Sequence, residues 1–303
     1  MILEVPSTLD QLEKHFWWWE GHQIVYSVTG SGIPLLLIHG FGACIGHWRK
    51  NIPVLSAAGY KVFAIDLLGF GDSDKAPVDY SLQLWERLII DFWQDHIGSP
   101  TVFVGNSIGA LLSLMVVSRH PRVSLGAVLI NSAGGLSHRP GEFNPIMRWV
   151  MQCFAQLVKS PLTGPLLFNF IRQRGRIRET LLQVYCDHEA VTDELVDMLY
   201  EPSCHPGAQK VFASIVTAPP GPRPNDLLPM IHRPLLVLWG DSDPWTPITS
   251  SNIYQEYAQA KAIQFIPIPN AGHCPHDECP QIVNQLILDW LPTLTQLEPS
   301  TIS

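Results

Sequence analysis

The chain has 303 residues, of which 46% are hydrophobic and only 15% are charged. This length can bury a large core, the composition excludes a disordered or fibrous chain, and the low charge suggests that some apolar surface faces an apolar partner. The 19 Lys and Arg residues against 27 Asp and Glu residues give a net charge of −8, which argues against nucleic acid as a partner because phosphate binding needs a basic face.

The first 135 residues alternate between apolar strands and helices. After a lead-in of fifteen residues, two short strands are expected between 16 and 28, with a turn at Glu20-Gly21. Continuous apolar runs then predict strands that are buried on both faces, at 34–38, 61–65, 101–104 and 127–130. Helical patterns lie between them, at 47–58, 81–96 and 108–119. This alternation predicts an α/β fold with a mostly parallel sheet that is flanked by helices.

The pattern changes after Asn131. About a hundred residues follow, with helical patterns at 145–159 and 191–200 and a proline-rich break at 218–224. Strand-like sequence resumes at 234–239 and 262–268, and a last helix is expected at 280–291. We therefore predict a core formed by residues 1–135 and 226–303, with a helical cap (lid) of residues 136–225 inserted after a core strand.

Neither a signal peptide nor a membrane span is expected. The first residues, MILEVP, lack the basic start and apolar centre of a signal peptide. The uncharged stretch 98–118 reaches spanning length, but a glycine-containing turn in its middle divides it into a strand and a helix. The six cysteines are scattered without a CxxC pair, which favours free thiols in a reducing compartment. The sequence therefore predicts a cytoplasmic protein.

A serine in the motif G-x-S-x-G lies between a predicted strand and a predicted helix. Gly105 and Gly109 permit the sharp turn that lifts Ser107 off the backbone, and the N-terminus of the helix favours developing negative charge. A serine hydroxyl needs a base, and the base needs an acid to orient it. His273 follows the last predicted strand and is the candidate base. Ser107 is the predicted nucleophile.

Two carboxylates compete for the role of the acid. Asp241 and Asp243 both follow a buried strand, and either gives the order Ser, Asp, His that this kind of fold uses. We favour Asp243, because the turn can project it toward His273, whereas Asp241 is expected to cap the turn. The end of the strand at 127–130 is followed by Asn131, so no carboxylate competes there.

Two backbone N–H groups are expected to stabilise an oxyanion. The loop at 39–42 (HGFG) offers the N–H of Phe41, and the N–H of Ile108, directly after the serine, is the second. His39 is interpreted as a buried structural histidine that ties down this loop. Asp66 is expected to bond loop amides and is given no catalytic role.

The segment 273–279 contains two histidines and two cysteines, which raises the alternative of a metal site. Its spacing lacks the paired ligands of zinc sites, and Pro275 bends it, so we expect no metal and no other cofactor. Asp277 or Glu278 is instead expected to cap the helix that starts near Pro280.

The predicted cap is basic within an acidic chain. Between Arg139 and Thr180, seven basic and two acidic residues give +5, and apolar residues including Trp149, Met151 and Phe154 are interspersed. One interpretation is an ordinary helix packed on the core, with its arginines on the solvated face. The other is an apolar cap that receives a long apolar substrate through those three side chains and rests on an anionic lipid surface.

Several segments together resemble the α/β-hydrolase superfamily. These are residues 39–42 (HGFG), 105–109 (GNSIG), 239–245 (WGDSDPW) and 271–278 (AGHCPHDE). Within the superfamily, the chain is similar to the chlorophyll dephytylase and pheophytinase group, through Asn106, residues 131–135 (NSAGG) and the run GHCPHD. The resemblance covers nearly the whole chain and assigns a catalytic triad to Ser107, Asp243 and His273.

The resemblance implies a serine hydrolase that cleaves the phytyl ester of chlorophyll or pheophytin through an acyl-enzyme. The products are phytol and a chlorophyllide or pheophorbide. An apolar, aromatic-rich cap could supply a tunnel for the long phytyl chain. Because the pigment resides in thylakoid membrane proteins, the resemblance leaves room for peripheral association with that membrane or with pigment proteins.

Two rival functions remain open. A general carboxylesterase or lipase for apolar esters would share the triad, so only a panel of substrates separates it from a pigment hydrolase. A non-catalytic receptor built on the same fold is disfavoured by a complete triad. Ser107 also disfavours dehalogenase and epoxide hydrolase chemistry, for which an aspartate would stand at the nucleophile position.

Overall fold

A twisted sheet of eight strands forms the centre of the protein. The computed structural model describes residues 12–137, 139, 144–258 and 262–296. The strand order is β1-β2-β4-β3-β5-β6-β7-β8; β1 and β2 are antiparallel to their neighbours, and the strands from β4 across to β8 are parallel. The strands are β1 Lys14–Trp19, β2 His22–Thr29, β3 Ile33–Ile38, β4 Tyr60–Ile65, β5 Thr101–Asn106, β6 Ser124–Ile130, β7 Leu235–Gly240 and β8 Ile263–Ile268. The predicted mostly parallel sheet is confirmed.

Helices cover both faces of the sheet, because successive residues of a buried strand point to opposite sides. In β3, Leu36 and Ile38 face the layer that contains α2 (Leu82–Phe92) and α3 (Ile108–Arg119). Leu35 and Leu37 face the layer that contains α1 (Ile52–Ala57) and α12 (Pro280–Trp290). Two apolar cores result, one on each face, and the continuous apolar runs of the strands are explained by this double burial.

One predicted helix is divided. The pattern at 47–58 forms a 3₁₀ turn, Ile45–Trp48, followed by α1 (Ile52–Ala57). Pro53 lies in the first turn of α1 and has no backbone N–H, so it cannot donate the bond that would join the two segments. The stretch 98–118 becomes β5 and α3, as predicted. In the part of the chain that the structure describes, no helix has the length and apolar character needed to cross a membrane.

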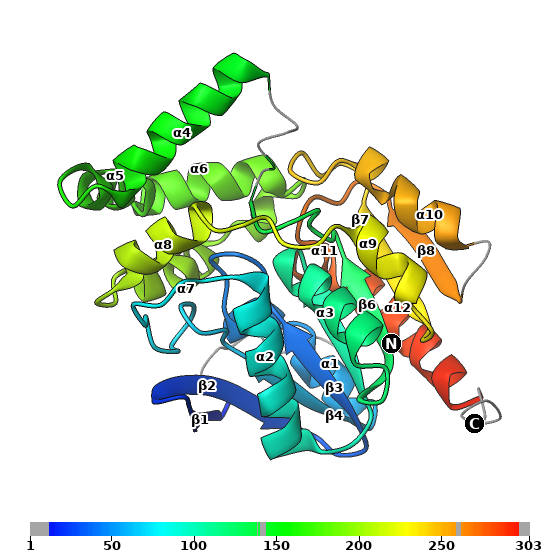
Figure 1. Cartoon of the computed structure of the whole chain (residues 1–303). Coiled ribbons are helices and arrows are strands. Elements are labelled where there is room, and N and C mark those ends of the chain that lie inside the picture. Colours follow the sequence, from blue (N-terminus) through cyan, green and yellow to red (C-terminus); the bar gives the residue numbers. More distant parts are fainter. Residues whose placement is uncertain (1–11, 138, 140–143, 259–261, 297–303) are drawn as a thin grey trace.

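Among the described residues, five helices of nine or more residues lie between β6 and β7. They are α4 Pro145–Lys159, α5 Thr163–Ile171, α6 Arg174–Val184, α7 Asp193–Ser203 and α8 Ala208–Val216. Figure 1 shows them grouped on one side of the sheet, with α4 projecting farthest from it. The predicted helix at 145–159 coincides with α4, whose first turn is capped by the side chain of Asn144. Short helices α9 (Pro224–Leu227), α10 (Asn252–Ala258) and α11 (Pro275–Glu278) complete the fold.

Candidate active site

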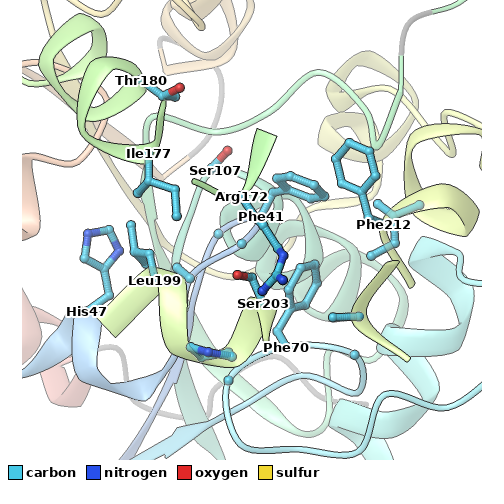
Figure 2. A pocket seen from close by; sticks show the side chains of 18 of the residues that line it. Phe41, His47, Phe70, Ser107, Arg172, Ile177, Thr180, Leu199, Ser203 and Phe212 are labelled. Carbon is cyan, nitrogen blue, oxygen red and sulfur yellow. The ribbon is translucent and has the colours of Figure 1, made fainter. Parts of the chain in front are cut away.

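Ser107 occupies a strained turn between β5 and α3. Its φ of 56° and ψ of −117° lie in a region that non-glycine residues rarely adopt. A Cβ on Gly105 would lie 2.1 Å from the carbonyl oxygen of Gly109, and one on Gly109 would lie 2.1 Å from that of Ile38. The two glycines of the motif are therefore required by close backbone approach. The turn leaves Ser107 partly exposed, at the wall of a cavity (Figure 2).

His273 and Asp243 form a buried hydrogen-bonded pair. The distance from His273 Nδ1 to Asp243 Oδ2 is 2.6 Å, and both residues are only 4% exposed. Burial raises the pKa of Asp243. The hydrogen bonds and charge of His273 and the hydrogen bonds of Thr246 lower it by a larger amount, so the pKa of Asp243 lies below its usual value. Because an ionised carboxylate only accepts hydrogen bonds, Nδ1 of His273 donates the proton of this bond, and Nε2 is the ring nitrogen outside the pair.

Asp241 has a different role. Its Oδ1 accepts hydrogen bonds from the hydroxyl of Ser242, at 2.8 Å, and from the backbone N–H of Asn270, at 2.9 Å. It is exposed and connects the turns after β7 and β8. Of the two carboxylates, the structure places Asp243 against His273 and uses Asp241 as a turn cap.

Asn131 holds Asp243 in place, and sequence reasoning missed this role. Its Nδ2 donates to Asp243 Oδ2 at 2.8 Å, and its Oδ1 accepts from the N–H of Gly240 at 3.0 Å. Asn131 is buried with a φ of 43°, a backbone conformation that asparagine tolerates better than most residues. The sequence did contain a signal for this role. Asn131 directly follows β6, and β6 is the neighbour of β7, the strand that precedes Asp243.

Asn106 connects the serine turn to the histidine loop. Its Nδ2 donates to the backbone oxygen of His273 at 2.9 Å, and also lies 3.3 Å from that of Ile130. The side chain that precedes Ser107 therefore fixes the position of the loop that carries His273. This contact gives a physical reason for an asparagine at that place in the motif.

A second buried carboxylate lies behind the histidine loop. Asp277 Oδ2 accepts from the hydroxyl of Tyr185 at 2.9 Å, while Oδ1 lies 2.9 Å from Arg49 Nη1 and 3.2 Å from Lys50 Nζ. Burial raises the pKa of Asp277. The neighbouring His47, Arg49 and Lys50 lower it by a larger amount, so the pKa of Asp277 lies below its usual value. The hydroxyl of Tyr185 also lies 2.8 Å from His47 Nε2. Asp277 thus pairs with two cations, the buried Arg49 and the partly buried Lys50.

The prediction that Asp277 or Glu278 caps α12 is wrong. Cys279 is the N-cap residue of α12, and no side chain caps that helix. Asp277 pairs with Arg49 and Lys50 instead, and Glu278 accepts from the N–H groups of Gly272, at 2.7 Å, and Asp187, at 2.6 Å. Together with a 2.8 Å bond from the N–H of His273 to the oxygen of Val184, these contacts attach the end of α6 to the histidine loop.

The two expected oxyanion donors lie beside Ser107. Ile108 is the first residue of α3, and Phe41 lines the same cavity as Ser107. A Cβ on Gly40 would lie 3.3 Å from Ser107 Cβ, so the loop that carries Phe41 approaches the serine closely. Among the described residues, no protein acceptor pairs with the backbone N–H of Phe41 or Ile108. Both groups are therefore available to an oxygen atom bound near Ser107.

His39 and Asp66 support this loop from beneath. His39 Nδ1 lies 2.7 Å from the oxygen of Gly40, and Nε2 accepts from the N–H of Leu67 at 3.0 Å. Burial lowers the pKa of His39 to about 4, so the ring is neutral. Asp66 accepts from the N–H groups of Ile45 and Asp72, at 2.7 and 2.8 Å. Their expected structural roles are confirmed.

The cavity that contains Ser107 and His273 is mostly apolar. Its volume is about 260 Å³, and its walls combine loops of the core with helices of the insertion. Figure 2 shows the phenylalanine side chains of Phe41, Phe70 and Phe212 on one side of Ser107, and Ile177, Leu199 and His47 on the other. The principal apolar residues are Phe41, Phe168, Ile177, Leu199, Phe212 and Ile215.

The three cap residues expected in this cavity lie elsewhere. Trp149 is 65% exposed and lines no cavity described here, whereas Met151 and Phe154 line a second, larger cavity of about 980 Å³. Trp245 belongs to the walls of both. The reason is the packing of α4, which lies against α5 and α8, while α5 to α8 occupy the space above Ser107.

The expected basic cluster is largely neutralised. Arg174 pairs with Asp197, Arg176 with Glu179, and Arg178 with Asp193. Arg172 lines the cavity and donates to Asn169 and Cys204.

Within the described residues, no cluster of three or more histidine, cysteine or acidic side chains could hold a metal ion.

Comparison with known proteins supplies a family and several relatives. The sequence model of the Alpha/beta hydrolase family matches residues 35–286. The chloroplastic pheophytinase of Arabidopsis thaliana is 29% identical; the alignment covers 86% of this chain and 61% of that protein, so the chain spans about three-fifths of its length. Among solved structures, a serine hydrolase involved in carbazole degradation has a TM-score of 0.73 at 21% identity, covering 93% of this chain and 99% of that one. A bacterial membrane phospholipase A has a TM-score of 0.72 at 25% identity, covering 94% and 87%.

Proposed function

Because this chain belongs to the alpha/beta hydrolase family, we propose that it is a serine hydrolase that cleaves the phytyl ester of chlorophyll-type pigments. The observation that carries ester hydrolysis is the apolar cavity that both Ser107 and the Asp243-bonded His273 line. The similarity to pheophytinase supports the choice of pigment.

In the proposed reaction, Ser107 is the nucleophile, His273 the base and Asp243 the acid. Nε2 of His273 accepts the proton as Ser107 Oγ attacks the ester carbonyl, and the ionised Asp243 stabilises the resulting imidazolium. The N–H groups of Phe41 and Ile108 hold the oxyanion. The histidine then protonates the leaving phytol, and water releases the pigment acid from the acyl-enzyme.

We assign the alcohol part of the ester to the apolar cavity. A phytyl chain has no polar group along its length, and each CH₂ that it buries contributes about 0.8 kcal/mol. Residues 136–225 act as a cap over the core of 1–135 and 226–303, since helices of this insertion supply much of the cavity wall. A pigment that resides in thylakoid membranes also implies a peripheral association of the protein with that membrane.

Pigment hydrolysis is tested by incubating the protein with chlorophyll a and with pheophytin a and separating the products. We expect phytol and a chlorophyllide or pheophorbide, and none of these with Ser107→Ala. If short acyl esters are cleaved while both pigments stay intact, the pigment assignment is wrong and the hydrolase assignment survives.

The cavity assignment has its own test. Phe212→Asp places a charge in the cavity and should lower kcat/KM for phytyl esters by at least about tenfold, while p-nitrophenyl acetate, which is too short to need this wall, changes little. Trp149→Asp is the matched control, because it introduces the same charge outside the described cavities. Equal losses on both substrates in a folded Phe212→Asp protein would contradict the assignment.

A general carboxylesterase for apolar esters is the second candidate. The cavity favours this function as well, because an apolar lining selects for a long apolar chain without specifying a pigment. Comparable kcat/KM values for phytylated pigments and for unrelated long-chain esters would support this function over the first.

A further inference from the structure

The outer side of α4 is an exposed apolar stripe. Ile146, Trp149, Val150 and Leu157 follow one another at intervals of three, one and seven residues, which places them on one side of the helix. Their side chains are 44% to 76% exposed. Val158, the only buried residue of α4, lies on another side of the helix. The stripe is therefore not the face that α4 packs on the protein.

The stripe continues beyond α4. Leu162, Leu166 and Phe170 are spaced by four residues along the start and the body of α5, and they are 80%, 70% and 49% exposed. Helices α4 and α5 pack against each other. We call these seven residues of the two helices the α4–α5 apolar face. Exposed apolar side chains gathered in this number on two neighbouring helices are typical of a surface that contacts a partner or a membrane.

The charges around this face are of one sign. The sequence from 144 to 178 contains no Asp or Glu, and Arg148, Lys159 and Arg172 lie within the two helices or at their ends. The arginines at 174, 176 and 178 belong to α6, where they are paired with acids. The two helices therefore carry basic but no acidic side chains, with Arg148 and Lys159 on the polar side of α4, although the whole chain has a net charge of −8.

We propose that the α4–α5 apolar face inserts into the surface of an anionic lipid bilayer. An amphipathic helix with an exposed apolar stripe and basic neighbours has the composition of an interfacial helix. Figure 1 shows α4 projecting away from the sheet, where a flat surface can reach it. A second copy of the chain is a poorer occupant, since pairing two such faces would bring helices that carry only basic charges close together.

The docking geometry explains access to the site. Phe168 and Ile171 of α5 line the cavity that contains Ser107, while Leu166 and Phe170 of the same helix point outward. A bilayer bound to α5 would therefore lie next to the cavity wall. This inference concerns where the protein binds and does not depend on which ester it cleaves.

The test uses sedimentation of the whole protein with vesicles of phosphatidylcholine that contain roughly one-quarter phosphatidylglycerol. We expect the wild-type protein to sediment with them and to bind pure phosphatidylcholine more weakly. The variant Ile146→Glu, Val150→Glu, Leu166→Glu should lose at least about tenfold in partition coefficient. Its hydrolysis of p-nitrophenyl acetate in solution should match the wild type, which shows that it is folded.

The matched control is Phe16→Glu, Trp18→Glu, Ile282→Glu. It also replaces three exposed apolar residues by glutamate, but on β1 and α12, and it should bind vesicles like the wild type. Equal losses in both triple variants, or no vesicle binding by the wild type, would overturn the proposal. So would a wild-type dimer in light scattering that the α4–α5 variant abolishes without any vesicle binding. Vesicle binding without pigment cleavage would count only against the proposed substrate.

Discussion

Helices α3 and α4 are both rich in apolar residues, yet their surroundings are opposite. In α3 every residue from Ile108 to Ser118 is buried, whereas in α4 only Val158 is buried. The sheet and neighbouring helices cover α3 on all sides, while α4 contacts only other helices of the insertion closely. Apolar sequence in the core is explained by packing within the chain, and in the insertion it indicates contact with something outside the chain.

The largest effect is expected where the core holds Ser107. Ser107→Ala should lower kcat for ester hydrolysis on the order of 10⁵-fold, because the base then has no hydroxyl to activate. Single-turnover kinetics on a p-nitrophenyl ester measure this, with circular dichroism as the control for folding. Turnover near the wild-type rate would exclude the serine mechanism.

The next effect separates the two carboxylates. Asp243→Asn should lower kcat on the order of 10⁴-fold, since an amide can donate to Nδ1 and stabilise the wrong tautomer of His273. Asp241→Asn changes only an exposed turn cap and should cost less than about threefold. The reverse ranking in steady-state assays would reassign the acid to Asp241.

A matched pair of substitutions sharpens the contrast between α3 and α4 directly. Leu111 in α3 is 0% exposed and Leu157 in α4 is 50% exposed. Leu111→Ala should lower the free energy of unfolding by about 3 kcal/mol, through lost burial and the cavity left behind. Leu157→Ala should change it by less than about 0.5 kcal/mol. Urea denaturation measures both, and a large loss for Leu157→Ala would show that the α4 stripe is packed within the protein.

The smallest effect is a dependence of stability on pH that arises in the core. Burial lowers the pKa of His39 and of His47 to about 4, from 6.5. Between these values the unfolded chain binds more protons than the folded one, so stability rises with pH and is lost as pH falls from 6.5 toward 4. Burial also lowers the pKa of His96 and His276, which adds to this trend. Burial raises the pKa of Asp66 to about 6, which opposes it.

Thermal unfolding midpoints measured between pH 4 and pH 7 test this balance. The midpoint should rise through the window, and in His47→Gln it should rise less steeply because one of the titrating rings is gone. A midpoint that falls with pH would mean that Asp66 dominates.

Much of the fold follows from local sequence. The apolar runs at 34–38, 61–65 and 101–104 identify β3, β4 and β5 because strands buried on both faces have no polar period. The expected helix at 47–58 failed at Pro53, where a missing N–H decides the break. The G-x-S-x-G motif identified the turn at Ser107, because its glycines are needed for contacts within a few residues and with one neighbouring strand.

By itself, the sequence determined the family, the sheet and the order of Ser107, Asp243 and His273 along the chain. Only the tertiary structure decided which side chains surround them. Asn131 and Asp243 are 112 positions apart, and Tyr185 and Asp277 are 92 positions apart. Trp149 was expected in the cavity and instead faces outward, because the packing of α4 against α5 and α8 sets its orientation. A local pattern states that a helix has an apolar face, but the direction of that face depends on contacts between segments that are distant in the sequence.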